Sequence, residues 1–253
     1  MCLVVRREGD RLIRYVHLST GNYNPATARV YTDLALLTSN PATASDVAML
    51  FNSLTGYAWH TDYHRLLVAP DGIRPGILQR IERVIAEHRS TGQGYLAFKL
   101  NALTDPACIQ ALYRASQAGV TVDLQVRSIY SLRPGVSGVS ERITVTSLVG
   151  RFLEHSRIFY FRYGDEEELL LGSADLMPRN LDGRIEILFP VDDPRLQRVI
   201  RDDILFTHLH NTKHLRLMDD KGSYSRLVAK SNDLPFDSQA WMLEHAGTRD
   251  GEE

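Results

Sequence analysis

An alternation of apolar, strand-like runs with amphipathic helical segments most constrains how this chain can fold. From residue 65 to residue 127 the sequence gives RLLVAP, a helix expected from about Pro75 to His88, YLAFKLN, a helix expected from about Asp105 to Ala118, and VTVDLQVR. Strands that alternate with helices of this length form βαβ units. The sequence therefore predicts an α/β fold, with a parallel or mixed sheet that is flanked by helices.

Further elements are expected on both sides of this region. RITVTSLV, RIFYFRYG, ELLLGSA and RIEILFPV are typical of strands, and a helix is expected from about Pro194 to His210. Apolar spacing predicts a short helix from Ser45 to Leu54. The opening LVVRREGDRLIRYVHL indicates a hairpin. Because its strands would otherwise form an exposed sheet edge, we interpret the chain as a fragment of a longer protein.

Length and composition limit the class of protein. The 253 residues, with 43% apolar and 24% charged side chains, suit one large or two smaller globular domains. No apolar run could span a bilayer and no signal peptide is evident, so we expect a cytoplasmic protein, with peripheral membrane association left open. The net charge of -2 gives no global attraction to a polyanion, so phosphate binding would need local clusters. Nucleic acid is not an expected partner.

Two histidines lie beside small, polar, turn-forming residues at expected strand ends. They are His17 in HLSTGNYN and His155 in EHSRIFYF. An imidazole titrates near neutral pH, so one ring could attack phosphorus and a facing ring could donate a proton. A single histidine at a strand end is more often structural than catalytic, so the neighbouring residues must decide.

Polar and basic neighbours of these histidines are candidates for binding phosphate or nucleotide. Asn22 lies in a turn that could cradle phosphate oxygens, although GNYNP also fits an ordinary turn. Arg157 faces the same side of its strand as His155, with a surface cation as an equal alternative. Lys99 could line a polyanion channel or simply reach into water. The other candidates are Arg127, Asn101, Arg133, Ser173, Arg179 and Asn180 for phosphate, and Tyr57 for stacking on a base.

Acidic residues and cysteines suggest no metal centre. Asp165, Glu166, Glu167 and Glu168 form a run at an expected hairpin turn, which indicates a solvated face rather than a metal site. Cys2 and Cys108 are expected to be ordinary thiols. We therefore expect no metal held within this chain.

The surroundings of the two histidines resemble the phospholipase D superfamily, whose motif His-x-Lys-x4-Asp occurs twice and is usually followed by Gly-Ser-x-x-Asn. Here Arg157 and Arg162 stand at the Lys and Asp positions of the second copy, and Ser19 and Asn24 stand there in the first. These departures disfavour a phosphodiesterase. Longer strings resemble the large, histidine-phosphorylated polyphosphate kinases: YVHLSTGNYNPATARVYTDLALLT, KLNALTD, LYRASQAGV, VRSIYSLRPGV, VGRFLEHSRIFYF and SADLMPRNLDGRIEILFPV.

The resemblance implies a fold and a reaction. Residues 1–62 would complete a first catalytic domain of phospholipase-D-like topology, residues 63–240 would form a second, and 241–253 would be a polar tail. His17 would become phosphorylated, His155 would assist transfer, and Arg127 would hold phosphates. Polyphosphate and ATP or ADP would be the substrates, with Mg²⁺ bridging the nucleotide phosphates.

The family also implies a possible homo-oligomer in the full-length enzyme and N-terminal domains that this chain lacks. Whether the chain is active alone therefore stays open at this point. Two alternatives remain: a phospholipase-D-like phosphodiesterase or nuclease, and an inactive fragment that binds polyphosphate or a partner chain.

Overall fold

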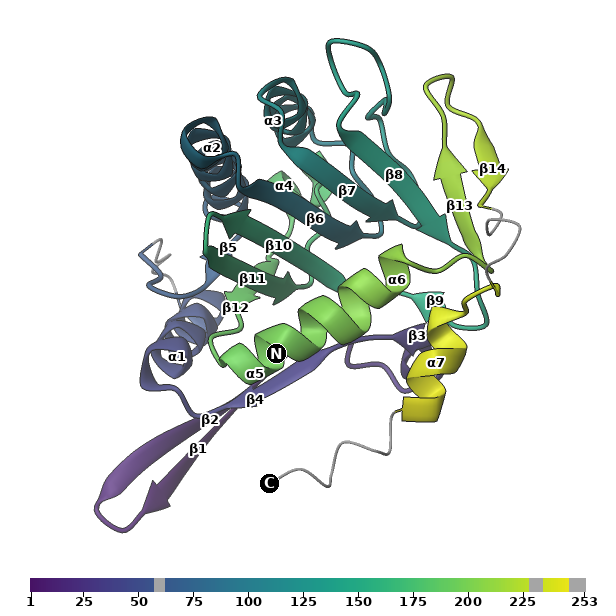
Figure 1. The fold of residues 1–253 in the computed structure, drawn as a ribbon. Coiled ribbons are helices and arrows are strands. Elements are labelled where there is room, and N and C mark those ends of the chain that lie inside the picture. Colours follow the sequence, from purple (N-terminus) through teal and green to yellow (C-terminus); the bar gives the residue numbers. More distant parts are fainter. Residues whose placement is uncertain (57–61, 228–233, 246–253) are drawn as a thin grey trace.

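A nine-stranded mixed sheet organises the computed structural model, which describes residues 1–56, 62–227 and 234–245 (Figure 1). In spatial order its strands are β14 (Tyr224–Arg226), β13 (Leu215–Met218), β8 (Ile143–Leu148), β7 (Thr121–Val126), β6 (Gly94–Leu100), β10 (Arg157–Tyr163), β11 (Glu166–Gly172), β12 (Ile187–Pro190) and β5 (Leu67–Val68). The strands β6, β7 and β8 run parallel and their other neighbours run antiparallel. The expected mixed α/β sheet is confirmed.

Helices cover both faces of this sheet (Figure 1). On one face α2 (Ile73–Thr91) and α3 (Pro106–Gln117) bury a core that includes Ile77, Leu112 and Phe98. On the other face lies a continuous helical segment, made of α5 (Pro194–Arg198), the π-helical η2 (Val199–Phe206) and α6 (Thr207–Leu209). The central parallel strands are largely buried because both sides are covered, although Lys99 and Gln125 are among their buried side chains.

The first part of the chain forms two smaller sheets. The strands β1 (Cys2–Glu8), β2 (Arg11–Ser19) and β4 (Ala35–Thr38) make an antiparallel sheet, and the β1–β2 hairpin projects from the molecule (Figure 1). After the short η1 (Thr27–Arg29), β3 (Tyr31–Thr32) pairs in parallel with β9 (Leu153–Glu154). This small ladder joins the beginning of the chain to the segment that precedes β10. The remaining helices are α1 (Pro41–Thr55), α4 (Pro178–Gly183) and α7 (Ser238–His245).

The strand expected in RLLVAP is shorter than predicted and lies elsewhere. Only Leu67–Val68 is extended, and it pairs with β12 at the sheet edge instead of lying beside β6. The buried Asp46 of α1 accepts hydrogen bonds from the backbone N–H groups of residues 64–66, which removes them from strand pairing. This strand is therefore not adjacent to β6, although it belongs to the same sheet and is joined to β6 through α2.

Two helix boundaries also differ from the sequence prediction. The helix α1 begins at Pro41 rather than Ser45, because the Asn40 side chain accepts two of its first backbone N–H groups. The polar tail expected from residue 241 begins inside a helix, because α7 extends to His245. The Asp237 carboxylate caps that helix by accepting from two backbone N–H groups of its first turn.

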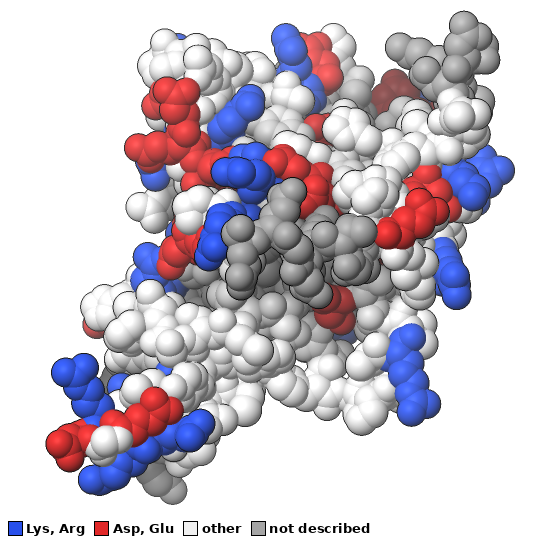
Figure 2. All heavy atoms as spheres, turned by 60° about the horizontal axis from the view of Figure 1, so that its bottom comes forward, with Lys and Arg blue, Asp and Glu red and all other residues white. Residues whose placement is uncertain are grey.

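Charges of both signs are interspersed on the face shown in Figure 2, and both gather on the projecting hairpin. The acidic run at the β10–β11 turn is solvated at Asp165 and Glu166, whereas Glu167 and Glu168 are only partly exposed. Three of its carboxylates pair with arginines: Glu166 with Arg83, Glu167 with Arg201, and Glu168 with Arg80. Within the described ranges, none of the helices has the length and apolar character needed to cross a membrane.

Candidate active site

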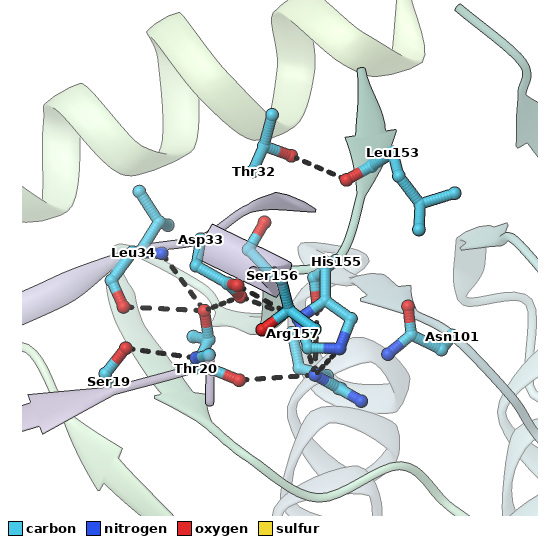
Figure 3. Close-up of polar contacts among 12 residues, drawn as sticks. Ser19, Thr20, Thr32, Asp33, Leu34, Asn101, Leu153, His155, Ser156 and Arg157 are labelled. Atoms are coloured by element: carbon cyan, nitrogen blue, oxygen red, sulfur yellow. Dashed lines mark hydrogen bonds and ion pairs between the residues drawn. The ribbon is translucent and has the colours of Figure 1, made fainter. Parts of the chain in front are cut away.

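His155 lies between β9 and β10 with its ring buried against Asp33 (Figure 3). Its Nδ1 is 2.9 and 3.0 Å from the two carboxylate oxygens of Asp33, and its ring lies 4.5 Å from that of Tyr31. The Thr20 hydroxyl donates to the same carboxylate at 2.7 Å. A carboxylate beside Nδ1 retains the proton on that nitrogen, so Nε2, which lies 3.1 Å from Nη1 of Arg157, is the nitrogen left for proton exchange.

Arg157 connects the end of β2 to the loop after β11. Its Nη2 donates to Asp175 at 3.0 Å, and its Nη1 donates to the backbone carbonyls of Thr20 at 3.2 Å and His155 at 3.1 Å. The side chain is buried, so Asp175 compensates its charge within the protein. In this structure the predicted phosphate ligand Arg157 therefore makes its hydrogen bonds to protein groups.

The ends of two parallel strands meet beside this ion pair. Asp175 accepts from the backbone N–H groups of Asn101, at 2.7 Å, and Ala102, at 3.1 Å. The Asn101 side chain accepts in turn from Nε of Arg127 at 2.9 Å. Burial and the nearby charge of Arg157 lower the pKa of Arg127. An anion bound here would relieve that unfavourable environment, so this strand edge suits phosphate.

Lys99 does not line an open channel as predicted, since it is only 1% exposed. Its Nζ lies 3.1 Å from a carboxylate oxygen of Glu154 and donates to the Ser156 hydroxyl at 2.7 Å. Burial lowers the pKa of both Lys99 and His208. Burial would raise the pKa of Glu154, but the charge of Lys99 and the hydrogen bond from His208 hold that pKa well below its usual range. The carboxylate is therefore ionised although it is buried.

His17 lies within β2, before the strand ends, and its ring contacts Tyr23. The Tyr23 hydroxyl is hydrogen-bonded to Nδ1 of His17 and also donates to its backbone carbonyl at 3.1 Å. A pocket of about 320 Å³ lies beside Tyr23 and is lined by Asn22 and Ser173 among others. Asn22 and Ser173, which were predicted from distant parts of the sequence, thus line the same pocket. Among the described residues, no hydrogen bond or ring contact joins His17 to His155.

The other predicted residues lie apart from these contacts. Arg179 is exposed on α4, whereas Asn180 is buried and donates to Glu186 at 2.8 Å. Arg133 donates to a backbone carbonyl of the β13–β14 turn at 2.6 Å, which anchors the loop that follows β7. Tyr57 lies outside the described residues.

The sequence prediction missed the polar partners that contact the predicted residues. They are Asp33, Glu154, Asp175, His208 and Gln239. One signal was present: Glu154 directly precedes His155 next to an apolar strand, and a carboxylate buried there must be paired. The remaining partners are too distant in the sequence for any local pattern to identify them.

Comparisons with known proteins agree with the family resemblance. The family model for polyphosphate kinase C-terminal domain 1 matches residues 1–60, and the model for C-terminal domain 2 matches residues 66–239. A polyphosphate kinase of Prosthecochloris aestuarii is 49% identical over 249 residues, which are 98% of this chain and 34% of that protein. One of Mycobacterium leprae is 57% identical over 248 residues, covering 96% of this chain and 33% of that protein.

A solved structure gives the same result. The crystal structure of polyphosphate kinase from Porphyromonas gingivalis matches with a TM-score of 0.89 at 39% identity, covering 96% of this chain and 37% of that chain. The chain spans about a third of the length of the curated relatives named above. With both family models matched in order and the fold shared across nearly its full length, this chain belongs to the polyphosphate kinase family.

Proposed function

We propose that this chain carries the phosphoryl-transfer site of a polyphosphate kinase, which exchanges phosphate between ATP and polyphosphate through a phosphohistidine. Membership of the family supports the reaction class. The observation that carries the proposal for this chain is the contact of His155 with Asp33, next to the partly buried Arg127. It combines a proton-exchanging imidazole with a cation that suits phosphate oxygens.

His17 is the proposed nucleophile. The Tyr23 hydroxyl donates its hydrogen to the backbone carbonyl of His17. The hydroxyl oxygen of Tyr23 can therefore accept a hydrogen bond from Nδ1–H of His17. That arrangement leaves the lone pair on Nε2 for attack. In the first step Nε2 bonds to the γ-phosphorus, the bond from that phosphorus to the β–γ bridging oxygen breaks, and ADP leaves.

The second step passes the phosphate on. A terminal oxygen of polyphosphate attacks the phosphorus, the P–N bond breaks, and the polymer is longer by one unit. The reverse sequence makes ATP. His155 exchanges a proton through Nε2 with the oxygen that leaves or attacks, while Asp33 retains the proton on Nδ1. Arg127 neutralises charge on the transferred group.

Magnesium is proposed to arrive with the nucleotide. The described residues contain no group of three or more His, Cys, Asp or Glu side chains that could hold a metal ion. The carboxylates of Asp33 and Asp175 face His155 and Arg157, so they do not fit as magnesium ligands. When bound, Mg²⁺ would offset charge on the nucleotide phosphates.

Labelling tests the proposal directly. The chain is incubated with Mg²⁺ and ATP carrying a labelled γ-phosphate, and the protein-bound label is tested in acid and alkali. Acid-labile, alkali-stable label that is absent from His17→Ala and present in the exposed control His210→Ala would support the phosphohistidine. Label that persists in His17→Ala, or no label on the unaltered chain, would overturn the proposal for this chain.

A further inference from the structure

Gln239 of α7 binds the backbone that leads into His155. Its Oε1 accepts from the N–H of Phe152 at 3.0 Å, and its Nε2 donates to the carbonyl of Phe152 at 3.0 Å and to Glu154 at 2.6 Å. One buried amide thus makes both backbone hydrogen bonds that a neighbouring strand would make. The approach is close, since a Cβ added at Gly150 would lie 2.4 Å from Oε1 of Gln239.

Glu154 links this restraint to the contact between Asp33 and His155. Thr32 and Glu154 are partners in the parallel β3–β9 ladder, and the Thr32 hydroxyl donates to Glu154 at 2.9 Å. Asp33 follows Thr32 and His155 follows Glu154, so the contact between Asp33 and His155 lies next to this pair in the ladder. Figure 3 shows Asp33 and His155 in contact. A shift of Glu154 would therefore move Nδ1 of His155 relative to the Asp33 carboxylate.

The remaining partners of Glu154 leave it little freedom. Lys99 and the Nε2 of His208 lie 3.1 and 3.2 Å from its carboxylate oxygen. With Thr32 and Gln239, donors from four separate elements converge on one desolvated carboxylate, where hydrogen bonds are strong. Loss of any donor leaves buried charge unsatisfied and favours rearrangement.

We propose that Gln239 is a positioning residue for His155: through Phe152 and Glu154, the helix α7 sets the Asp33–His155 contact. The role of His155 as a proton donor rests on the proposed function. The proposed effect of Gln239 is on the geometry of the His155 ring, so it can be measured without enzymatic turnover.

The test compares Gln239→Leu, which keeps the size but loses the hydrogen bonds, with Glu244→Gln, an exposed control on the same helix. NMR of histidine-labelled protein measures the share of the Nδ1–H tautomer of His155, and hydrogen exchange measures the Phe152 amide. In Gln239→Leu we expect exchange at least about tenfold faster and a clear fall in the tautomer share. Glu244→Gln should match the unaltered chain in both.

A second variant tests the same contact without altering Gln239. Gly150→Ala would push the amide away and should reproduce both changes, which keeps the test open if Gln239→Leu does not fold. If the folded variants keep the tautomer share of His155 while only their stability falls, Gln239 is structural and the proposal is overturned. Absent labelling of His17 would overturn the proposed function alone, because neither readout here requires phosphate transfer.

Discussion

Lys99→Met should destabilise the protein strongly, because it leaves Glu154 charged and buried without its main partner. The side chains of Lys99 and Glu154 are 2% and 5% exposed, with Nζ and the carboxylate 3.1 Å apart. Removing one partner of such a pair typically costs about 3–5 kcal/mol. Methionine retains much of the apolar stem, so little of the loss comes from packing. For a protein of this size the melting temperature should fall by about 6–20 °C.

A double-mutant cycle isolates the charge pairing from other effects. Glu154→Gln alone should cost a similar amount, since it strands the ammonium of Lys99. The double variant removes both charges, so its loss should be smaller than the sum of the single losses by about 2 kcal/mol or more. Urea unfolding at pH 7.5 measures all three free energies.

The surface pair Arg114–Glu82 is the matched control. Its charges approach within 2.6 Å, but both side chains are about half exposed, at 50% and 51%. Glu82→Gln should therefore cost less than about 1 kcal/mol. Losses that add to within about 0.5 kcal/mol in the Lys99–Glu154 cycle would refute the idea that the buried charges stabilise each other.

Three further outcomes follow from the same contacts. Burial lowers the pKa of His208, so the unfolded chain binds a proton at this residue more readily than the folded chain does. The free energy of unfolding should therefore fall as the pH drops from about 7.5 to 5.5. Urea unfolding of His208→Gln should show a weaker dependence of that free energy on pH. Asp33→Asn should slow phosphate transfer about 10²–10⁴-fold with little change in KM, since asparagine holds the Nδ1 proton of His155 poorly; unchanged single-turnover labelling would contradict this. Arg127→Lys should weaken polyphosphate binding about tenfold, because lysine cannot reproduce a guanidinium oriented by Asn101; equal affinity in titration calorimetry would argue against that role.

The sheet was predictable where strand and helix patterns alternate locally. Apolar runs correctly located β6, β7 and β8, and the helical spacing located α2 and α3 to within a few residues. The position of β5 was not predictable, because it depends on Asp46, which takes the backbone N–H groups of residues 64–66. The spacing of apolar residues in a sequence does not show that a side chain on one helix will bind the backbone of a strand elsewhere in the chain.

The sequence indicated candidate residue types more readily than their contacts. His155 and Arg157 were singled out from their neighbours and lie in contact with each other, and Asn22 and Ser173 line one pocket. Lys99 was misjudged, since a lysine at a strand end usually reaches water, whereas this one meets Glu154 across 55 positions of sequence. Pairing at that distance is decided by how β6 and β9 are placed, which the local pattern does not contain.

The arrangement of charges explains why so many elements converge behind one histidine. The imidazole that we propose to exchange protons would gain from a fixed partner, and Asp33 can supply one only while β3 and β9 keep their register. Register in a ladder of two residues per strand is weakly specified by its backbone hydrogen bonds alone. The buried carboxylate of Glu154 adds to that specification, because its donors lie on β3, β6, α6 and α7 and all of them contact it in this register. Burying the charge of Glu154 costs free energy, but the contacts that compensate this charge also hold the geometry around His155.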